Sequence, residues 1–579
     1  MKLIFFAPFS GIWEHAELEA RAAAALQKAG HAVTYITCAG VLRRHCVTMA
    51  AKHLPANASE DARKAVCRKC RARADAVRRE FGLAGPKIDD LVGAEELGRI
   101  DASLDRENPR ELAELRWHDI PVGRRAFFPL LVYKKKDDLD LDESQWREYR
   151  DQLHQTMVAV SAARNFLAAN KADRVLTYSA TYSVISTFLD AAQSLGVAGY
   201  FTEASGNLAH RSRRAILGKG GIIQWFGALR SAWPSFERHP ADASLLGEVG
   251  DHAVTLFGAA SPFSYSTAAG SDAAAVRSAV QAPPGAKLLL ATMSSHDEWF
   301  AAEAAGLAQI RPSAFPSQLD WLDWLVDYAR QRPEVHLVIR VHPREFPNRR
   351  EHTGLTSSHS YKLRARLVDL PPNCVVNWPS QQLSLYDLAK AADVVLNAWS
   401  SAGKEMALLG LPVVEWAPDV LLYPPEPRYC GRTPEEYALC IQQALEDGWR
   451  EANIVRMFRW CALEYGAASY VTRNDPSPNP AKPPLVLRAV RRLARERVDA
   501  WIARRNHLPA ESVREIESTL ADGRPLLVRS ARGDAKAEAH ALATQIDRMK
   551  TALFPRSDAG SAGLGERLSQ AARHLRTDH

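Results

Sequence analysis

The sequence lacks the features that mark membrane-spanning, secreted or nucleic-acid-binding proteins. No apolar run reaches the roughly 18 residues that a helix needs to cross a bilayer, and no unit of about 20–50 residues repeats. The apolar run at 3–8 is short and a Glu-containing helix follows it, so it indicates a first β-strand and not a signal peptide. The net charge of +7 is small for 579 residues, and no RNA- or DNA-binding signature accompanies it. We therefore expect a cytoplasmic protein that does not bind nucleic acid.

The length and composition indicate a soluble protein with more than one domain. A chain of 579 residues is too long for one ordinary core, so two large domains with additional segments are expected. Hydrophobic residues make up 46% of the chain and charged residues 24%, as in other globular proteins.

Two α/β units are predicted in the N-terminal part. Their expected elements are strand 3–8, helix 15–29, strand 31–37, then helix 143–170, strand 174–179, helix 182–195 and strand 197–205. A basic helical insertion that carries cysteines separates the two units at about 38–82, and the pattern at 83–140 is irregular. In open α/β sheets ligands bind at the carboxyl ends of the strands, so the loops after these strands are candidate sites.

A second α/β domain begins near residue 287. Its expected elements are strand 287–293, helix 317–331, strand 335–343, strand 373–379 and the compact unit 384–418. We predict an α/β fold in which two Rossmann-like domains face each other. The predicted domains are 1–285, which includes the 38–82 insertion, 286–474, and a Pro-rich linker with a basic helical tail at 475–579.

The unit 384–418 contains the strongest candidate for a phosphate site. A Ser-Ser turn, Ser400 and Ser401, lies where a buried strand ends and a helix begins, so free backbone N–H groups favour a phosphate there. Glu405 in the first turn of that helix is suited to accept hydrogen bonds from ribose hydroxyls. The alternative is a helix that Ser401 caps, with Glu405 favourably placed at its positive end.

Two further strand ends in the same domain carry polar side chains. Arg340 and His342 lie on one face at the end of a strand, where they are suited to a diphosphate. Ser294 and Ser295 follow the first strand of the domain and present hydroxyls at a strand-to-helix junction. The alternatives are a charged strand end with a satisfied histidine, and an ordinary helix N-cap.

The N-terminal domain offers candidates for a catalytic base. Glu14, His15 and Glu17 lie at the junction between the first loop and its helix, where a carboxylate or imidazole would deprotonate an acceptor hydroxyl. Glu203, at the end of another strand, is a second candidate on the acceptor side. Acidic residues also favour helix N-termini for purely structural reasons, and the sequence leaves this choice open.

Cysteine is scarce but unevenly placed. Four of the 8 cysteines fall within 33 residues, in the pattern C-x7-C-x20-C-x2-C: Cys38, Cys46, Cys67 and Cys70. Four thiolates suit a structural Zn²⁺ or iron–sulfur cluster, and the surrounding arginines and lysine would offset their charge. The alternative is four unligated thiols. A redox-active CxxC is disfavoured because no thioredoxin-like strand precedes it.

The segment 485–505 has apolar residues at near-helical spacing and seven arginines against two acids. Such a basic amphipathic helix suits an anionic membrane surface, which would place the protein peripherally at the inner membrane. The alternative is a helix that packs back on the N-terminal domain.

With IRVHPR at 339–344 and SLYDLAKAADVVLNAWSSAGKEMALLGLPVV at 384–414, the chain resembles capsule and surface-polysaccharide glycosyltransferases of the GT-B architecture. The resemblance extends to Kdo-transferase-like proteins and, more distantly, to CDP-glycerol glycerophosphotransferases. It implies a nucleotide-sugar donor in the C-terminal domain and an acceptor in the N-terminal one. The donor would meet Arg340, His342, Ser400, Ser401 and Glu405.

We therefore expect a glycosyltransferase that moves a sugar from a nucleotide sugar to a glycan or lipid-linked acceptor in bacterial capsule or lipopolysaccharide synthesis. Such a reaction needs aligned substrates and positive groups on the departing nucleotide, which this site would supply without a metal. The alternatives are a GT-B nucleotide-sugar epimerase, and a non-catalytic polysaccharide-assembly or metal-binding subunit with a GT-B shell.

Overall fold

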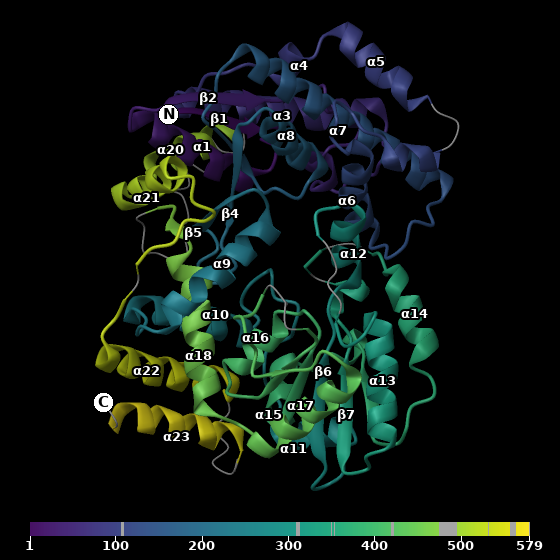
Figure 1. Ribbon diagram of the computed structural model, residues 1–579, viewed down its shortest axis with the longest axis vertical. Coiled ribbons are helices and arrows are strands. Elements are labelled where there is room, and N and C mark those ends of the chain that lie inside the picture. Colours follow the sequence, from purple (N-terminus) through teal and green to yellow (C-terminus); the bar gives the residue numbers. More distant parts are fainter. Residues whose placement is uncertain are drawn as a thin grey trace.

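The computed structural model describes residues 1–105, 109–308, 313–348, 350–351, 354–417, 422–473, 495–530, 532–555 and 563–577. It contains two six-stranded sheets, each in a domain of its own (Figure 1). The purple and blue N-terminal domain and the green C-terminal domain lie one above the other in this view. The predicted α/β fold class with two Rossmann-like domains is confirmed.

The N-terminal sheet has the strand order β12-β5-β4-β3-β1-β2. Its strands are β1 (Lys2–Ala7), β2 (Ala32–Thr37), β3 (Arg174–Tyr178), β4 (Ala198–Ala204), β5 (Arg214–Lys219) and β12 (Tyr470–Val471). Strands β1 to β4 pair in parallel, which follows from their nearly continuous apolar runs, and β5 is antiparallel to β4. Its predicted helices are present as α1 (Trp13–Lys28), α7 (Glu143–Ala169) and α8 (Ser183–Ser194).

The C-terminal sheet has the strand order β11-β10-β9-β6-β7-β8, and all its strands are parallel. Its strands are β6 (Lys287–Thr292), β7 (Val335–Arg340), β8 (Cys374–Asn377), β9 (Val394–Asn397), β10 (Val413–Glu415) and β11 (Tyr429–Cys430). Its helices are α12 (His296–Ala304), α13 (Gln318–Arg330), α14 (Ser358–Arg366), α15 (Leu385–Ala391), α16 (Ala402–Ala407) and α17 (Pro434–Asp447).

Helices that the sequence pattern did not resolve join the two domains. The irregular stretch folds into α4 (Ile88–Leu91), α5 (Ala94–Leu104), η1 (Pro109–Glu114) and α6 (Val122–Lys134), and α6 packs against α12 of the other domain. The crossing segment contains α9 (Ile222–Glu237), α10 (Ala243–Phe257) and α11 (Ala273–Ala279). The chain returns through α18 (Glu451–Cys461) and η4 (Ala462–Ala467) to β12, so it has re-entered the N-terminal sheet before the predicted boundary at 474.

The C-terminal tail is folded onto the N-terminal part. It contains α20 (Arg495–Arg505), α21 (Ala510–Ala521), α22 (Ala535–Leu553) and α23 (Leu564–Thr577). Helix α20 packs on the helix of the cysteine-bearing insertion with Ala500 and Ala503 buried, and Arg504 lies 3.7 Å from Glu80. This agrees with the packing alternative for 495–505, whereas 485–494 lie outside the described residues. Within the described parts, no helix is long and apolar enough to cross a bilayer.

The insertion forms two helices, α2 (Val47–Ala50) and α3 (Glu60–Phe81). The Ser59 hydroxyl caps the start of α3 by accepting from the Ala62 N–H. Gly82 ends the helix in the left-handed conformation at φ 66°, which glycine adopts without strain. Helix α3 packs against α1, so the insertion lies beside the first βαβ unit.

Glu19 of α1 joins that helix to the end of β3 and provides a test of the fold. Its buried carboxyl accepts from the Tyr178 N–H at 2.8 Å, and burial raises its pKa from 4.5 to about 8. The unfolded chain ionises this group above pH 4.5 while the folded chain keeps it protonated to about pH 8, so its contribution to stability falls as the pH rises between these values.

We therefore expect Glu19→Gln, which keeps the acceptor oxygen, to raise the free energy of unfolding at pH 8 by roughly 1–3 kcal/mol. At pH 4.5 the variant and the parent should be alike. Urea denaturation at both pH values measures the difference, with the exposed Glu446→Gln as control. An equal effect of Glu19→Gln at both pH values would contradict the assignment.

Candidate active site at the domain junction

Loops at the carboxyl ends of β6 and β9 are hydrogen-bonded to each other. The Ser294 Oγ accepts from the Trp399 N–H at 3.0 Å, and the Ser294 N–H donates to Gln318 at 2.8 Å. The Ser295 hydroxyl donates to Asp297 Oδ1 at 2.7 Å. Both hydroxyls therefore hold the loop in shape, and their contact with a donor stays a prediction.

The Ser-Ser turn and Glu405 form one hydrogen-bonded group. The Ser401 hydroxyl donates to one carboxylate oxygen of Glu405 at 3.1 Å, and the Tyr386 hydroxyl donates to the other at 2.9 Å. The Ser400 Oγ accepts from the Ala402 N–H at 3.3 Å. Burial raises the pKa of Glu405 despite these two donors. The predicted turn and helix are confirmed, and the carboxylate is already oriented by Tyr386, a partner that the sequence did not reveal.

Arg340 and His342 have different surroundings. The buried Arg340 guanidinium donates to Asn377 and to the Leu383 carbonyl at 2.6 Å, and burial lowers its pKa to about 10. It therefore fixes the end of β7 to the segment after β8, and its polar contacts are within the protein. Its predicted contact with the donor phosphates receives no support from this geometry.

His342 is half-buried, and its ring presents a hydrogen-bond donor. Its Nδ1 accepts from the Arg344 N–H at 3.3 Å, so the neutral ring carries its proton on Nε2. Burial, and then the charge of Arg344, lower the pKa of His342 to about 3, so the ring is neutral at physiological pH. Tyr265 packs edge-on against it with centroids 5.1 Å apart.

Cationic and aromatic side chains continue from His342 toward the N-terminal domain. Arg350 lies over the Tyr265 ring at 4.3 Å, and Arg211 lies over the Phe263 ring at 4.8 Å. Phe263 is 40% exposed, so this surface is accessible to a ligand. Arg211 comes from the N-terminal domain, between β4 and β5, and Arg350 of the C-terminal domain lies 6.0 Å from the same Phe263 ring, so side chains of both domains meet here.

The residues of the first loop occupy three different environments. Glu14 is exposed, and Glu17 pairs with the buried Arg21 one helical turn away. His15 is buried and stacks on the Tyr178 ring with centroids 3.9 Å apart. Burial lowers the pKa of His15 to about 3, so it stays neutral and is a weak base. The structure does not bring the three residues together into one catalytic group.

Glu203 lies at the point where both domains contribute carboxylates. Burial raises the pKa of this half-buried residue, and the charge of Arg211 opposes the rise. Burial, followed by the charges of Glu203 and of Glu298 from α12, raises the pKa of Tyr182 to about 12. The charges of two carboxylates, one from each domain, therefore both act on Tyr182, and the 57% exposed Glu298 side chain lies 3.6 Å from Arg344. We call the region formed by these side chains the domain junction. Its members are Tyr182, Glu203, Arg211, Phe263, Tyr265, Glu298, His342 and Arg350.

Sequence reasoning missed most of the residues that connect the predicted ones at the domain junction. The missed residues are Tyr178, Tyr182, Arg211, Phe263, Tyr265 and Arg350. One available signal was the pair of tyrosines at the end of β3 and in the loop after it, in the same position relative to the sheet as the loops that were predicted.

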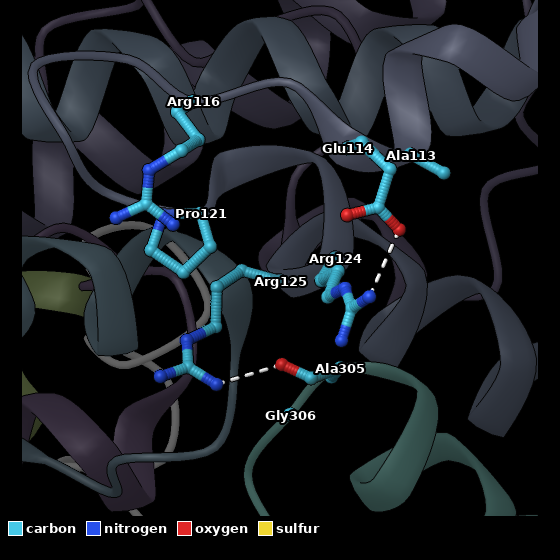
Figure 2. Close-up of a pocket in the computed structure, with 8 residues that line it drawn as sticks. All are labelled: Ala113, Glu114, Arg116, Pro121, Arg124, Arg125, Ala305 and Gly306. Carbon is cyan, nitrogen blue, oxygen red and sulfur yellow. Dashed lines mark hydrogen bonds and ion pairs between the residues drawn. The ribbon is translucent and has the colours of Figure 1, made fainter.

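A separate pocket of about 500 Å³ lies between η1, α6 and the end of α12 (Figure 2). Three arginines line it, and each has a protein partner. Arg124 pairs with Glu114 at 2.9 Å, and Arg125 donates to the Ala305 carbonyl of the other domain at 2.7 Å, as the dashed lines show. Arg116 donates to the Asp119 carbonyl. The pocket is electropositive and spans the two domains, and no predicted site residue lines it.

Asp137, His296 and His359 gather ligand atoms within 4.8 Å of one another and are residue types that bind divalent metals. Here the Asp137 carboxylate already accepts from His359 at 3.1 Å and from Lys362 at 2.8 Å. Although burial opposes it, these hydrogen bonds lower the pKa of Asp137. Because a lysine occupies the carboxylate, we interpret the cluster as an ion-paired contact between α14 and the segment after α6.

The four clustered cysteines line one cavity of the N-terminal domain, together with Pro8, and all are free thiols. Burial raises the pKa of Cys46 to about 12. The predicted grouping in space is therefore present, whereas the identity of a metal centre stays a prediction.

Solved structures of two enzyme classes show distant likeness to the chain. A putative UDP-N-acetylglucosamine 2-epimerase from Listeria monocytogenes aligns at 11% identity over 80% of this chain and 92% of that one, with a TM-score of 0.26. UDP-GlcNAc 2-epimerase from Neisseria meningitidis, bound to UDP-GlcNAc, aligns at 13% identity over 79% of this chain and 96% of that one, with a TM-score of 0.25. Spinosyn rhamnosyltransferase SpnG complexed with thymidine diphosphate aligns at 13% identity over 80% of this chain and 95% of that one, with a TM-score of 0.23.

No protein-family model and no curated protein matches the chain. At these identities and TM-scores the solved structures carry no argument about activity.

Proposed function

We propose that the protein is a glycosyltransferase that moves a sugar from a nucleotide-sugar donor to a glycan or lipid-linked acceptor in the synthesis of a bacterial surface polysaccharide. The observation that carries the proposal is the domain junction. There Arg211 of the N-terminal domain, whose charge acts on Glu203, lies over the Phe263 ring, which is 6.0 Å from Arg350. On the C-terminal side Glu298 lies 3.6 Å from Arg344, whose N–H donates to the neutral ring of His342.

The chemistry of glycosyl transfer matches this arrangement of charge. The departing nucleoside diphosphate gains negative charge, which His342 and Arg350 on the C-terminal side would stabilise. The acceptor hydroxyl must lose a proton, which Glu203 on the N-terminal side would accept. Because burial raises its pKa above the ordinary value for glutamate, Glu203 is a stronger base than an exposed carboxylate. These roles need no metal at the reaction centre.

His342→Ala tests the donor half of the proposal. Losing an N–H donor from a site of developing charge typically costs about 10²–10³-fold in rate, and we expect a loss of about 10²-fold in kcat/KM. His342→Gln, which keeps an N–H donor, should recover part of the loss. The exposed His540→Ala is the matched control. An unchanged rate of donor turnover in His342→Ala would refute the assignment.

A panel of donors with product analysis tests the proposed function as a whole. We expect one class among UDP-, GDP-, CMP- and CDP-linked sugars to raise the melting temperature, and its sugar to reach an acceptor. Epimerisation of the donor without an acceptor would instead identify the epimerase alternative. If the protein bound none of these nucleotides, the non-catalytic alternative would remain.

We place the reaction at the inner face of the membrane, where lipid-linked acceptors of surface polysaccharides are found. The described part of 485–505 uses its small residues to pack on α3. The side chains of Arg495, 3.7 Å from Asp499, and of Arg505, over the Trp501 ring, are exposed and would meet anionic lipid. Flotation with anionic and neutral vesicles measures this contact directly.

A further inference from the structure

Four cysteines from two separate segments of the insertion converge on one cavity. Cys38 and Cys46 come from the segment between β2 and α2, and Cys67 and Cys70 lie one turn apart on α3. The other four cysteines of the chain lie elsewhere, in or near the C-terminal domain. A set of metal ligands requires its side chains to converge in this way, whereas packing of the domain does not.

The backbone around these sulfur atoms donates hydrogen bonds to them. Cys70 Sγ accepts from the Gly11 N–H at 3.1 Å, and Cys38 Sγ accepts from the Gly40 N–H at 3.3 Å. A neutral thiol is a weak acceptor, whereas N–H groups directed at metal-bound sulfur are a common means of tuning such centres.

The separation of the sulfur atoms is wider than a single zinc ion needs. Tetrahedral zinc with Zn–S distances of about 2.3 Å would hold its sulfurs about 3.8 Å apart. Among the described residues, Asp137, His296 and His359 form a compact trio within 4.8 Å, and the cysteines form no such trio. A polynuclear cluster spaces its four thiolates further apart than one ion does, and Arg71 at the cavity wall would offset its negative charge.

We propose that Cys38, Cys46, Cys67 and Cys70 ligate one iron–sulfur cluster, and that this cluster fixes the loop between β1 and α1. The inference does not depend on the proposed glycosyl transfer.

The second half of the proposal rests on contacts between α3 and that loop. Gly11 donates to Cys70 through its N–H, and its carbonyl accepts from Arg73 at 2.9 Å. The Arg73 guanidinium also lies over the Trp13 ring at 5.6 Å. A Cβ at Gly11 would lie 2.3 Å from Thr48 Cγ2, so the loop and the insertion pack without spare room. Loss of the cluster would therefore release the loop that leads into Glu14 and His15.

The metal content of the full chain, purified anaerobically and reconstituted with Fe²⁺ and sulfide, tests the first half. We expect iron and acid-labile sulfide in equal amounts, with a broad visible absorption that each of the four Cys→Ser substitutions abolishes. Cys430→Ser and Cys440→Ser are the matched controls and should retain it. Stoichiometric zinc without sulfide, or no metal in the wild-type protein, would overturn the proposal whether or not the variants fold.

Hydrogen exchange of the cluster-loaded and cluster-free protein tests the second half. We expect amides in 9–14 to exchange at least ten-fold faster without the cluster, while those of β7 in the other domain stay unchanged. Equal protection of the loop in both states would refute its fixation by the cluster. Neither readout uses glycosyl transfer, so failure here and failure of the proposed function are distinguishable.

Discussion

Replacing Glu203 by glutamine is expected to lower kcat by about 10²–10⁴-fold, the usual contribution of a general base. Glutamine keeps the size of the side chain but cannot accept the proton of the acceptor hydroxyl. Donor binding should be preserved, because the proposed phosphate contacts come from the other domain. Steady-state kinetics with saturating donor, together with calorimetric binding of the nucleotide, separate the two effects.

The dependence of activity on pH provides a second readout for Glu203. A general base is active only when deprotonated, so activity should fall as the pH drops through its pKa. Because burial raises that pKa, the acidic limb should lie above the ordinary value of 4.5 for glutamate. The limb should disappear from the residual activity of Glu203→Gln and persist in the exposed control Glu446→Gln. A Glu203→Gln enzyme with unchanged kcat would exclude this role.

Removing one partner of the buried Lys404–Glu464 pair is expected to destabilise the protein by about 3–5 kcal/mol, because an uncompensated charge remains buried. Lys404 Nζ lies 2.9 and 2.7 Å from the two carboxylate oxygens of Glu464. The side chains are 4% and 8% exposed, and they join α16 to the segment through which the chain returns to the N-terminal domain. Urea denaturation of Glu464→Ala measures the loss.

The double variant Lys404→Met/Glu464→Leu removes both charges and should recover most of the stability, because neither charge is then left unpaired. Arg428→Ala, which breaks an exposed pair with Asp447, is the control and should cost at most about 1 kcal/mol. If Glu464→Ala behaved like Arg428→Ala, the pair would not be buried in solution.

The unit 384–418 could be predicted well because its signals are local. Apolar runs mark β9 and β10, and Ser384 caps α15 by accepting from the Tyr386 N–H. The same kind of local pattern predicted the first βαβ unit to within one or two residues. The stretch 83–140 lacks such a pattern, and its helices are stabilised by contacts with α7, α8 and α12 that only the folded chain brings together.

The candidate site was predictable only in part. Strand ends are local features, so the loop of His342 and the Ser-Ser turn were found. Alternation along a strand gives the face of Arg340, but Asn377 on the neighbouring strand decides where its guanidinium bonds. The combined effect of the Glu203 and Glu298 charges on Tyr182 depends on how two domains meet, which no local pattern records.

By itself, the sequence determined that this protein is built from two parallel α/β domains with ligand loops at their strand ends, and that four cysteines stand apart from the rest. Hydrophobic periodicity, helix caps and residue spacing are properties of short segments, so they can be read without the fold. Only the tertiary structure decided which side chains share a site. It set Tyr182 under the charges of Glu203 and Glu298 from the two domains, gave the Arg340 guanidinium a hydrogen-bond partner within the protein, and gathered the cysteines around one cavity beside Gly11. Those outcomes depend on contacts between residues that are far apart in the chain. Burial, charge and hydrogen bonding act between such residues only after the domains have packed together.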